Sequence, residues 1–228
     1  LEDPTLPYKK SRKTKADTAR ENGLEPLAKI IMAQNARDLK GAAARFLNKN
    51  ISSTEDALEA ARHIIAEWIN ERTDIRNYLR NQIARSGQIT SKLIKAKKDD
   101  EKALKYKDYF DWEESLNRIP SHRFLALSRA AEEGFIRIKV EIDTERALDN
   151  IANRLLNSQG ACGKQIELAV ADAYKRLLFP ALSNEALSAA KEKADAEAIS
   201  VFAKNLRQLL LGSPLGEKRI LALDPGFR

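Results

Sequence analysis

Apolar residues recur every three to four positions along most of this 228-residue chain, the spacing that puts them on one face of an α-helix. In the clearest case, a capping site at 52–54 and two acidic residues precede an apolar face between residues 58 and 69. We expect helices of this kind over residues 16–22, 24–31, 39–46, 55–69, 74–83, 123–133, 144–156, 164–179 and 183–211.

The remaining segments follow other patterns. Residues 135–142 alternate apolar and charged side chains, which predicts a strand. A second short strand is expected at 219–223, before the turn at 224–226. Residues 90–118 alternate lysines with acidic residues, which is typical of a solvated helix face. Pro180 is expected to interrupt the helical pattern between the last two helices.

These patterns predict a mainly α fold, a multi-helix array with a helix-turn-helix-like unit and one or two short β-strands. We expect an N-terminal helical region at 1–90, which would hold that unit, and a central helical region at 91–212 with a strand at about 135–142. Residues 213–228 would begin a truncated further domain. Because the chain starts without Met and stops just after a strand-and-turn pattern, we expect it to be a fragment.

Composition limits the function. Charged residues make up 32 % of the chain, and the net charge of +7 favours a polyanionic partner if the excess is clustered. The lone cysteine, Cys162, excludes an intrachain disulfide, and with only two histidines it fits no familiar zinc pattern, so no cofactor is expected. A cytoplasmic location is the simplest interpretation, and no apolar run is long enough for a membrane span.

Part of the positive charge is clustered near the N-terminus. Flexible cations of this kind neutralise nucleic-acid phosphates without reading sequence. A solvated arm, or one that packs against another domain, fits the same pattern equally well. The candidate contact residues are Lys9, Lys10, Arg12, Lys13, Lys15 and Arg20.

A second candidate lies where Pro120 ends one segment and Ser121, His122 and Arg123 begin the next. Side chains that are adjacent on a helix point apart, so a serine beside a histidine does not form a nucleophile–base pair. We therefore expect Ser121 to cap the helix. His122 and Arg123 would pair with a carboxylate or bind an anion at the helix start, and we favour the structural role.

Three ordered stretches together resemble one family. The first combines Leu-Pro-Tyr-Lys at 6–9 with the segment 20–27. The second runs from Ile-Pro-Ser-His-Arg at 119–123 to Glu-Gly at 133–134, with Ala130 where the pattern has glycine. The third begins with Ser-Pro-Leu-Gly at 213–216 and ends with Leu-Asp-Pro-Gly-Phe-Arg at 223–228. In this order and at these separations, they resemble the bacterial Tex family of transcription accessory proteins.

The resemblance implies a helix-turn-helix-like region followed by a YqgF domain of ribonuclease-H type, helix-hairpin-helix units and an OB-fold RNA-binding domain. Residues 213–228 would start the YqgF domain. The family is also similar to a eukaryotic elongation factor, which implies a role in transcription. The expected partners are RNA or single-stranded nucleic acid, mainly through domains outside this chain, and RNA polymerase or the ribosome.

Asp224 would correspond to the first-strand carboxylate that binds metal in ribonuclease-H-type nucleases. Two-metal cleavage needs several converging carboxylates, so we expect no enzyme activity and no metal here. Our leading hypothesis is a non-catalytic helical scaffold that contributes sequence-independent RNA binding through Lys/Arg–phosphate contacts. One alternative is a protein-interaction scaffold without nucleic-acid contact. Another is part of a metal-dependent nuclease that uses Asp224.

Overall fold

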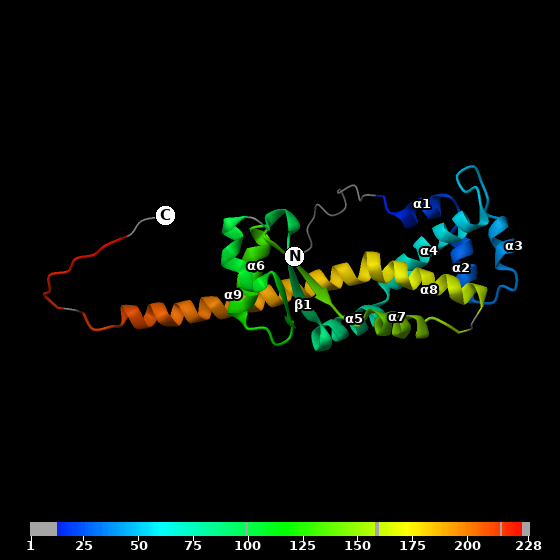
Figure 1. Ribbon diagram of the computed structural model, residues 1–228. Helices are drawn as coiled ribbons and strands as arrows, with labels where there is room; N and C mark the ends of the chain where they lie inside the picture. Colours follow the sequence, from blue (N-terminus) through cyan, green and yellow to red (C-terminus); the bar gives the residue numbers. More distant parts are fainter. Residues whose placement is uncertain (1–12, 99, 158–159, 215, 225–228) are drawn as a thin grey trace.

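The computed structural model describes residues 13–98, 100–157, 160–214 and 216–224. The fold is mainly α with one small three-stranded sheet, as the sequence predicted (Figure 1). The α-helices are α1 Lys15–Glu21, α2 Glu25–Ala33, α3 Leu39–Ala44, α4 Thr54–Glu71, α5 Thr73–Ser86, α6 Ser121–Glu132, α7 Thr144–Asn153, α8 Ala161–Ala173 and α9 Phe179–Leu210. The 3₁₀ helices are η2 Lys95–Lys97 and η3 Glu101–Tyr109, a π-helix forms η4 Tyr174–Leu178, and the strands are β1 Gln88–Leu93, β2 Asp111–Ser115 and β3 Ile136–Glu141.

Helix α4 is the centre of the N-terminal helices. Its start is fixed by a capping box, in which the Ser53 hydroxyl accepts from the Asp56 N–H and the Asp56 carboxylate accepts from the Ser53 N–H. Its apolar face is buried against α1, α2, α3 and α8. Only Arg72 separates α4 from α5, so the helix pair predicted at this place is present. Its role as a helix-turn-helix-like unit stays a prediction.

Helices α8, η4 and α9 follow one another without a break, with lengths of 13, 5 and 32 residues. The prediction that Pro180 interrupts the helix is therefore wrong. Proline lacks an N–H and its ring clashes with the carbonyl four residues earlier. The π-turn before it, in which the Phe179 N–H donates to the Tyr174 carbonyl, is wider than an α-turn and carries the helix past the proline.

The three strands form an antiparallel sheet in the order β2-β1-β3. The strand predicted at 135–142 is confirmed as β3, but the solvated helix predicted at 90–118 is wrong, because this segment contains most of β1, both 3₁₀ helices and β2. Both missed strands carry few apolar residues: β1 buries Ile89 together with the polar Thr90 and Ser91, and β2 has no fully buried residue. Their alternation is therefore too weak to be distinguished from a charged helix.

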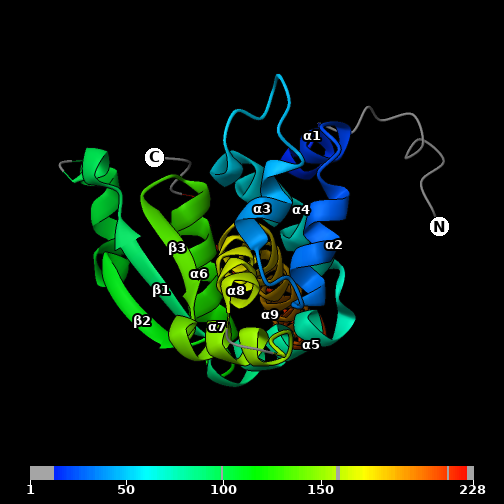
Figure 2. The same ribbon diagram turned by 90° about the vertical axis from the view of Figure 1, so that its right-hand side faces the viewer.

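The core consists of two apolar clusters. The first joins α1–α5 to α7, α8 and η4. The second lies between the inner face of the sheet and α6, and includes Ile89, Phe124, Leu127 and Ile136. Figure 2 shows α6 between the sheet and the long helix, so one face of the sheet packs on helices and the opposite face does not. None of the described helices has the length and apolar content to span a membrane.

The two ends of the described chain differ from the central part. The second half of α9 projects beyond the sheet and α6 (Figure 1), and its side chains from 199 to 210 are exposed. The strand predicted at 219–223 is wrong for this chain, since these residues are exposed and have no regular secondary structure. A strand requires a neighbouring strand for its backbone hydrogen bonds, and none lies beside this segment in the part of the chain that the structure describes.

Candidate functional site

The predicted N-terminal contact residues are only partly within the structure. Lys9, Lys10 and Arg12 lie outside the described residues. Lys13 forms an ion pair with Glu21 at the other end of α1. Arg20 binds Glu67 of α4, with 2.7 Å between Nη2 and Oε2, and also contacts Asp17 at 3.2 Å.

Arg20 therefore serves packing rather than an open surface, since its ion pair ties α1 to the central helix. Its side chain is 32 % exposed and that of Glu67 is 20 % exposed, so the pair is partly screened from water. Lys15 is exposed and forms no ion pair with another described residue. For the described members of the segment, the packing interpretation fits Lys13 and Arg20, and the contact interpretation fits only Lys15.

The two predicted residues at the start of α6, His122 and Arg123, have different surroundings. Nη1 of Arg123 lies 2.7 Å from Oε2 of Glu114, so this cation ties α6 to β2, while His122 is exposed. The predicted cap at Ser121 is wrong: Pro120 occupies the N-cap position without a side-chain bond, and the Ser121 hydroxyl donates to Glu197 of α9. Helices α1 and α6 lie far apart (Figure 1), so the structure does not bring the predicted residues together.

Asp224 lies in the exposed segment at 216–224. No group of three or more His, Cys, Asp or Glu side chains within the described ranges has an arrangement that could hold a metal ion. Two-metal chemistry needs several converging carboxylates, and no described cluster of three or more such ligands accompanies Asp224.

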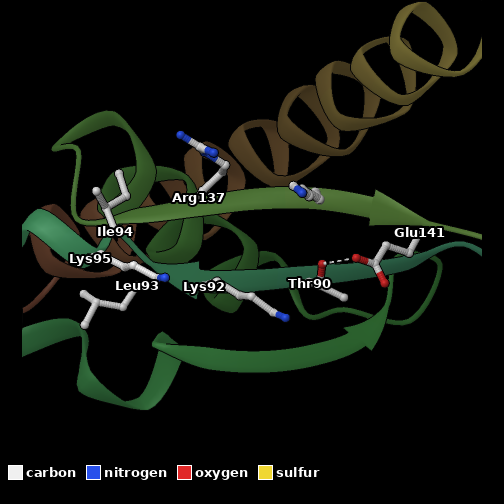
Figure 3. Close-up of a pocket in the computed structure, with 8 residues that line it drawn as sticks. Thr90, Lys92, Leu93, Ile94, Lys95, Arg137 and Glu141 are labelled. Carbon is white, nitrogen blue, oxygen red and sulfur yellow. Dashed lines mark hydrogen bonds between the residues drawn. The ribbon is translucent and has the colours of Figure 1, made fainter. Parts of the chain in front are cut away.

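A different surface has the properties of a site. Alternate residues of the three strands point away from α6 and form a polar outer face of the sheet. This face holds a hollow of about 370 Å³ that runs along β1 and β3 to the start of η2 (Figure 3). Its lining residues are Thr90, Lys92, Leu93, Ile94, Lys95, Arg137, Lys139 and Glu141.

Four of the lining side chains are cations, and we call Lys92, Lys95, Arg137 and Lys139 the cationic strip. All four are exposed, and none forms an ion pair or a hydrogen bond with a side chain elsewhere in the described ranges. Lys92 and Arg137 are direct partners in the register of β1 and β3. Like charges opposite each other destabilise a sheet, and the opposite charge of Asp111, the partner of Lys92 on β2, offsets part of this repulsion.

The outer face also carries carboxylates, and two of them lie beside members of the cationic strip, Asp111 beside Lys92 and Glu141 beside Lys139. Asp111 and Glu113 lie on β2, where they are the register partners of Lys92 and Thr90. Glu141 stands at the far end of the hollow and accepts a hydrogen bond of 3.4 Å from the Thr90 hydroxyl. The outer face thus carries four cations on β1, β3 and η2, with carboxylates at Glu141 on β3 and along the β2 edge.

The sequence held a partial signal for this surface. The alternation at 135–142 already puts Arg137 and Lys139 on one face of a strand. Lys92 and Lys95 join them only because β1 pairs with β3, and β1 was interpreted as part of a charged helix. The cationic strip was therefore missed together with the strand that builds half of it.

Fold and surface together define a basic, mainly helical chain with one polar sheet face. The sequence profile described as Tex central region-like matches residues 34–202. The chain therefore belongs to the Tex family, as the three sequence stretches indicated.

Individual relatives agree with this assignment. The whole chain aligns with the transcriptional accessory protein Tex of Neisseria gonorrhoeae at 38 % identity, and covers 31 % of that protein. It aligns with protein YhgF of Escherichia coli (strain K12) at 32 % identity over 31 % of that protein. The S1 RNA-binding domain-containing protein 1 of Homo sapiens is 30 % identical over the whole chain, which covers 24 % of it. The chain thus spans about a third or less of each of these relatives.

Proposed function

We propose that this chain is a non-catalytic scaffold module of a Tex-like transcription accessory protein, and that it contributes sequence-independent RNA binding in the cytoplasm. Lys and Arg side chains contact phosphates, while the continuous helix from α8 to α9 holds neighbouring parts of the protein in position. Two relatives support the proposal by name, one as a transcriptional accessory protein and one as an RNA-binding-domain protein. The charge of +7 favours the same kind of partner.

The observation that carries the proposal is the group of four exposed cations with no ion-pair partner in the described part of the chain. Elsewhere many basic side chains are neutralised, as Arg20 is by Glu67, Arg80 by Glu185 and Arg176 by Asp172. A cation that is already paired must give up a carboxylate before it binds a phosphate. The four cations of the strip lose only bound water when they bind a phosphate, because none of them is in an ion pair with a described residue.

A salt titration tests this proposal. The chain is titrated with a labelled single-stranded RNA between about 50 and 200 mM salt, the range over which phosphate contacts weaken steeply. Four contacts give a slope of about −3 in a plot of log K against log salt, because each contact on a single strand contributes about −0.7. Absence of binding at low salt, or a slope near zero, would contradict the proposal.

The non-catalytic part of the proposal has its own test. The chain is incubated with RNA and DNA substrates in the presence of Mg²⁺ or Mn²⁺. We expect no cleavage, since the described residues provide no cluster of metal ligands. Metal-dependent cleavage by the intact protein, lost on Asp224→Asn, would revive the nuclease alternative.

A second candidate function rests on the projecting half of α9. Four exposed apolar residues recur there at the three-four-three spacing of a helix–helix seam. We call this set the apolar seam: Ile199, Phe202, Leu206 and Leu209. Phe202 and Leu209 are 67 % and 77 % exposed, which is costly for side chains of this size unless another surface covers them. The seam supports a protein-contact role for this end of the chain.

Binding to purified RNA polymerase and to ribosomes, each treated with nuclease, tests the second candidate. If α9 forms the contact, Phe202→Glu abolishes binding and the matched exposed change Gln208→Glu on the same helix leaves it intact. Equal binding by both variants would exclude the apolar seam as a protein-contact surface.

A further inference from the structure

The outer face of the sheet carries exposed cations along a line that a single-stranded nucleic acid could follow. We infer that the cationic strip binds the phosphodiester backbone of single-stranded nucleic acid, and that the acidic β2 edge disfavours a duplex. This inference rests on the proposed function, because it assigns the RNA contact to one surface and one class of ligand.

The spacing of the strip suits consecutive phosphates. Arg137 and Lys139 are two residues apart on β3, which separates them by about 6.8 Å along the strand. Lys92 stands opposite Arg137 on β1, about 4.8 Å across the sheet, and Lys95 follows at the start of η2. The cations therefore line the hollow from both strands, with Arg137 and Lys139 on β3, Lys92 on β1 and Lys95 on η2. Figure 3 shows Lys92, Lys95 and Arg137 in these places.

The lining of the hollow also indicates what is recognised. No aromatic side chain occurs among its eight lining residues, so it has no platform on which bases stack. Leu93 and Ile94 are apolar lining residues at the end near Lys95 (Figure 3), and the other lining residues are cations apart from Thr90 and Glu141. Such a site holds phosphates electrostatically and does not discriminate bases.

The carboxylates explain why one strand fits better than two. Asp111 and Glu113 lie on β2, two strand spacings or about 9.6 Å from β3. A duplex is stiff and carries a second phosphate strand across its groove. Placing one of its strands over Arg137 and Lys139 brings the other toward this acidic edge, where like charges repel. A flexible single strand follows the basic side alone.

The test compares variants with the same change in charge. Arg137→Gln with Lys139→Gln removes two charges from the strip, and Lys204→Gln with Arg207→Gln removes the same residue types from the exposed half of α9. Fluorescence anisotropy with a uridine oligomer of roughly 15 nucleotides measures the affinity. We expect the strip variant to bind about tenfold more weakly and its salt slope to lose about 1.4, and the α9 variant to stay within about twofold.

Charge removal at the β2 edge tests the preference for a single strand. We expect the wild-type chain to bind the oligomer more tightly than an RNA duplex of equal length, and Asp111→Asn with Glu113→Gln to reduce that preference by strengthening duplex binding. Thermal unfolding followed by circular dichroism verifies that each variant is folded. Equal single-strand and duplex affinities in the wild type, or a ratio unchanged in this variant, would overturn the inferred discrimination.

The outcomes separate the inference from the proposed function. RNA binding by the wild-type chain, with equal losses in the strip and α9 variants, would overturn the strip as the site and leave the proposed function intact. Absence of RNA binding by the wild-type chain would overturn both. A selective loss in the strip variant supports both.

Discussion

Two basic regions of this chain look alike in sequence and differ in the structure. Lys13 precedes α1 and Arg20 lies in its last turn, and each forms an ion pair with a carboxylate, Glu21 of α1 and Glu67 of α4. The cationic strip has four cations, and none of them forms an ion pair with a described carboxylate. The difference shows that pairing, rather than density along the chain, decides which positive charges are available to a ligand.

The cause lies in how each element presents its side chains. On α1, residues three to four positions apart meet on one face, so Asp17 reaches Arg20. On a strand, alternate residues share a face and their neighbours come from other strands. Lys92 faces Arg137 because of the register of two segments more than 40 residues apart in sequence. Arg20 is thus neutralised by Asp17 on its own helix and by Glu67 on α4, whereas the four cations of the sheet face form no ion pair with a described residue.

The largest effect on the free energy of unfolding is expected from a change in the apolar cluster on which the sheet packs. Leu127 is fully buried in the cluster between α6 and the sheet, so Leu127→Ala should lower the free energy of unfolding by about 2–5 kcal/mol. Urea unfolding measures this change. The matched exposed substitution Leu209→Ala should change it by less than about 0.5 kcal/mol. Similar losses in both would mean that the second cluster does not hold the sheet.

Breaking the ion pair of α1 should have a smaller effect and should act on stability alone. Arg20→Gln removes the 2.7 Å contact with Glu67, and we expect a loss of up to about 1 kcal/mol, since the pair is partly exposed. RNA affinity should stay within about twofold. A double-mutant cycle with Glu67→Gln isolates the pair. A large loss of RNA affinity with unchanged stability would make Arg20 a contact residue after all.

Acid should lower the free energy of unfolding, and Asp172 on α8 is expected to account for part of this loss. Burial opposes ionisation of Asp172, but the bonds from Arg176 and His63 outweigh it and hold the pKa of this carboxyl below its usual 3.8. A lowered folded-state pKa stabilises the fold above pH 3.8, and this contribution is lost as pH falls through the lower folded value.

Urea unfolding between about pH 2 and 7 measures the contribution of Asp172. Asp172→Asn should flatten the decline below pH 3.8 and lower stability at neutral pH. An unchanged pH profile in this variant would show that other carboxyls account for the acid sensitivity.

The smallest expected effect is a gain in stability. Arg137→Gln removes the like charge opposite Lys92 and should raise the free energy of unfolding by about 0.2–0.5 kcal/mol at low salt. The gain should disappear at about 1 M salt, where the repulsion is screened. Urea midpoints at the two salt concentrations provide the measurement. A loss of stability, or a gain that salt does not change, would mean that the two cations do not repel each other.

Most of the helices could be predicted from sequence because their apolar spacing is regular and their ends carry local signals. The capping box at Ser53 and Asp56 is such a signal, as is Gly23, whose φ of +78° suits glycine at the end of α1. The helix break at Pro180 was wrong because a π-turn, which no local pattern announces, accommodates the proline. The candidate site depends on register between distant strands, so the sequence predicted the strand that carries Arg137 and Lys139 but did not identify these residues as part of a site.

The most direct test of the cationic strip maps RNA contacts on the folded chain. A ¹⁵N-labelled sample is titrated with a single-stranded uridine oligomer, and amide shifts are followed by NMR at low salt. We expect the largest shifts in β1, β3 and η2, around Lys92, Lys95, Arg137 and Lys139, with little change in α1. Shifts concentrated in α1 and absent from the sheet would contradict the account.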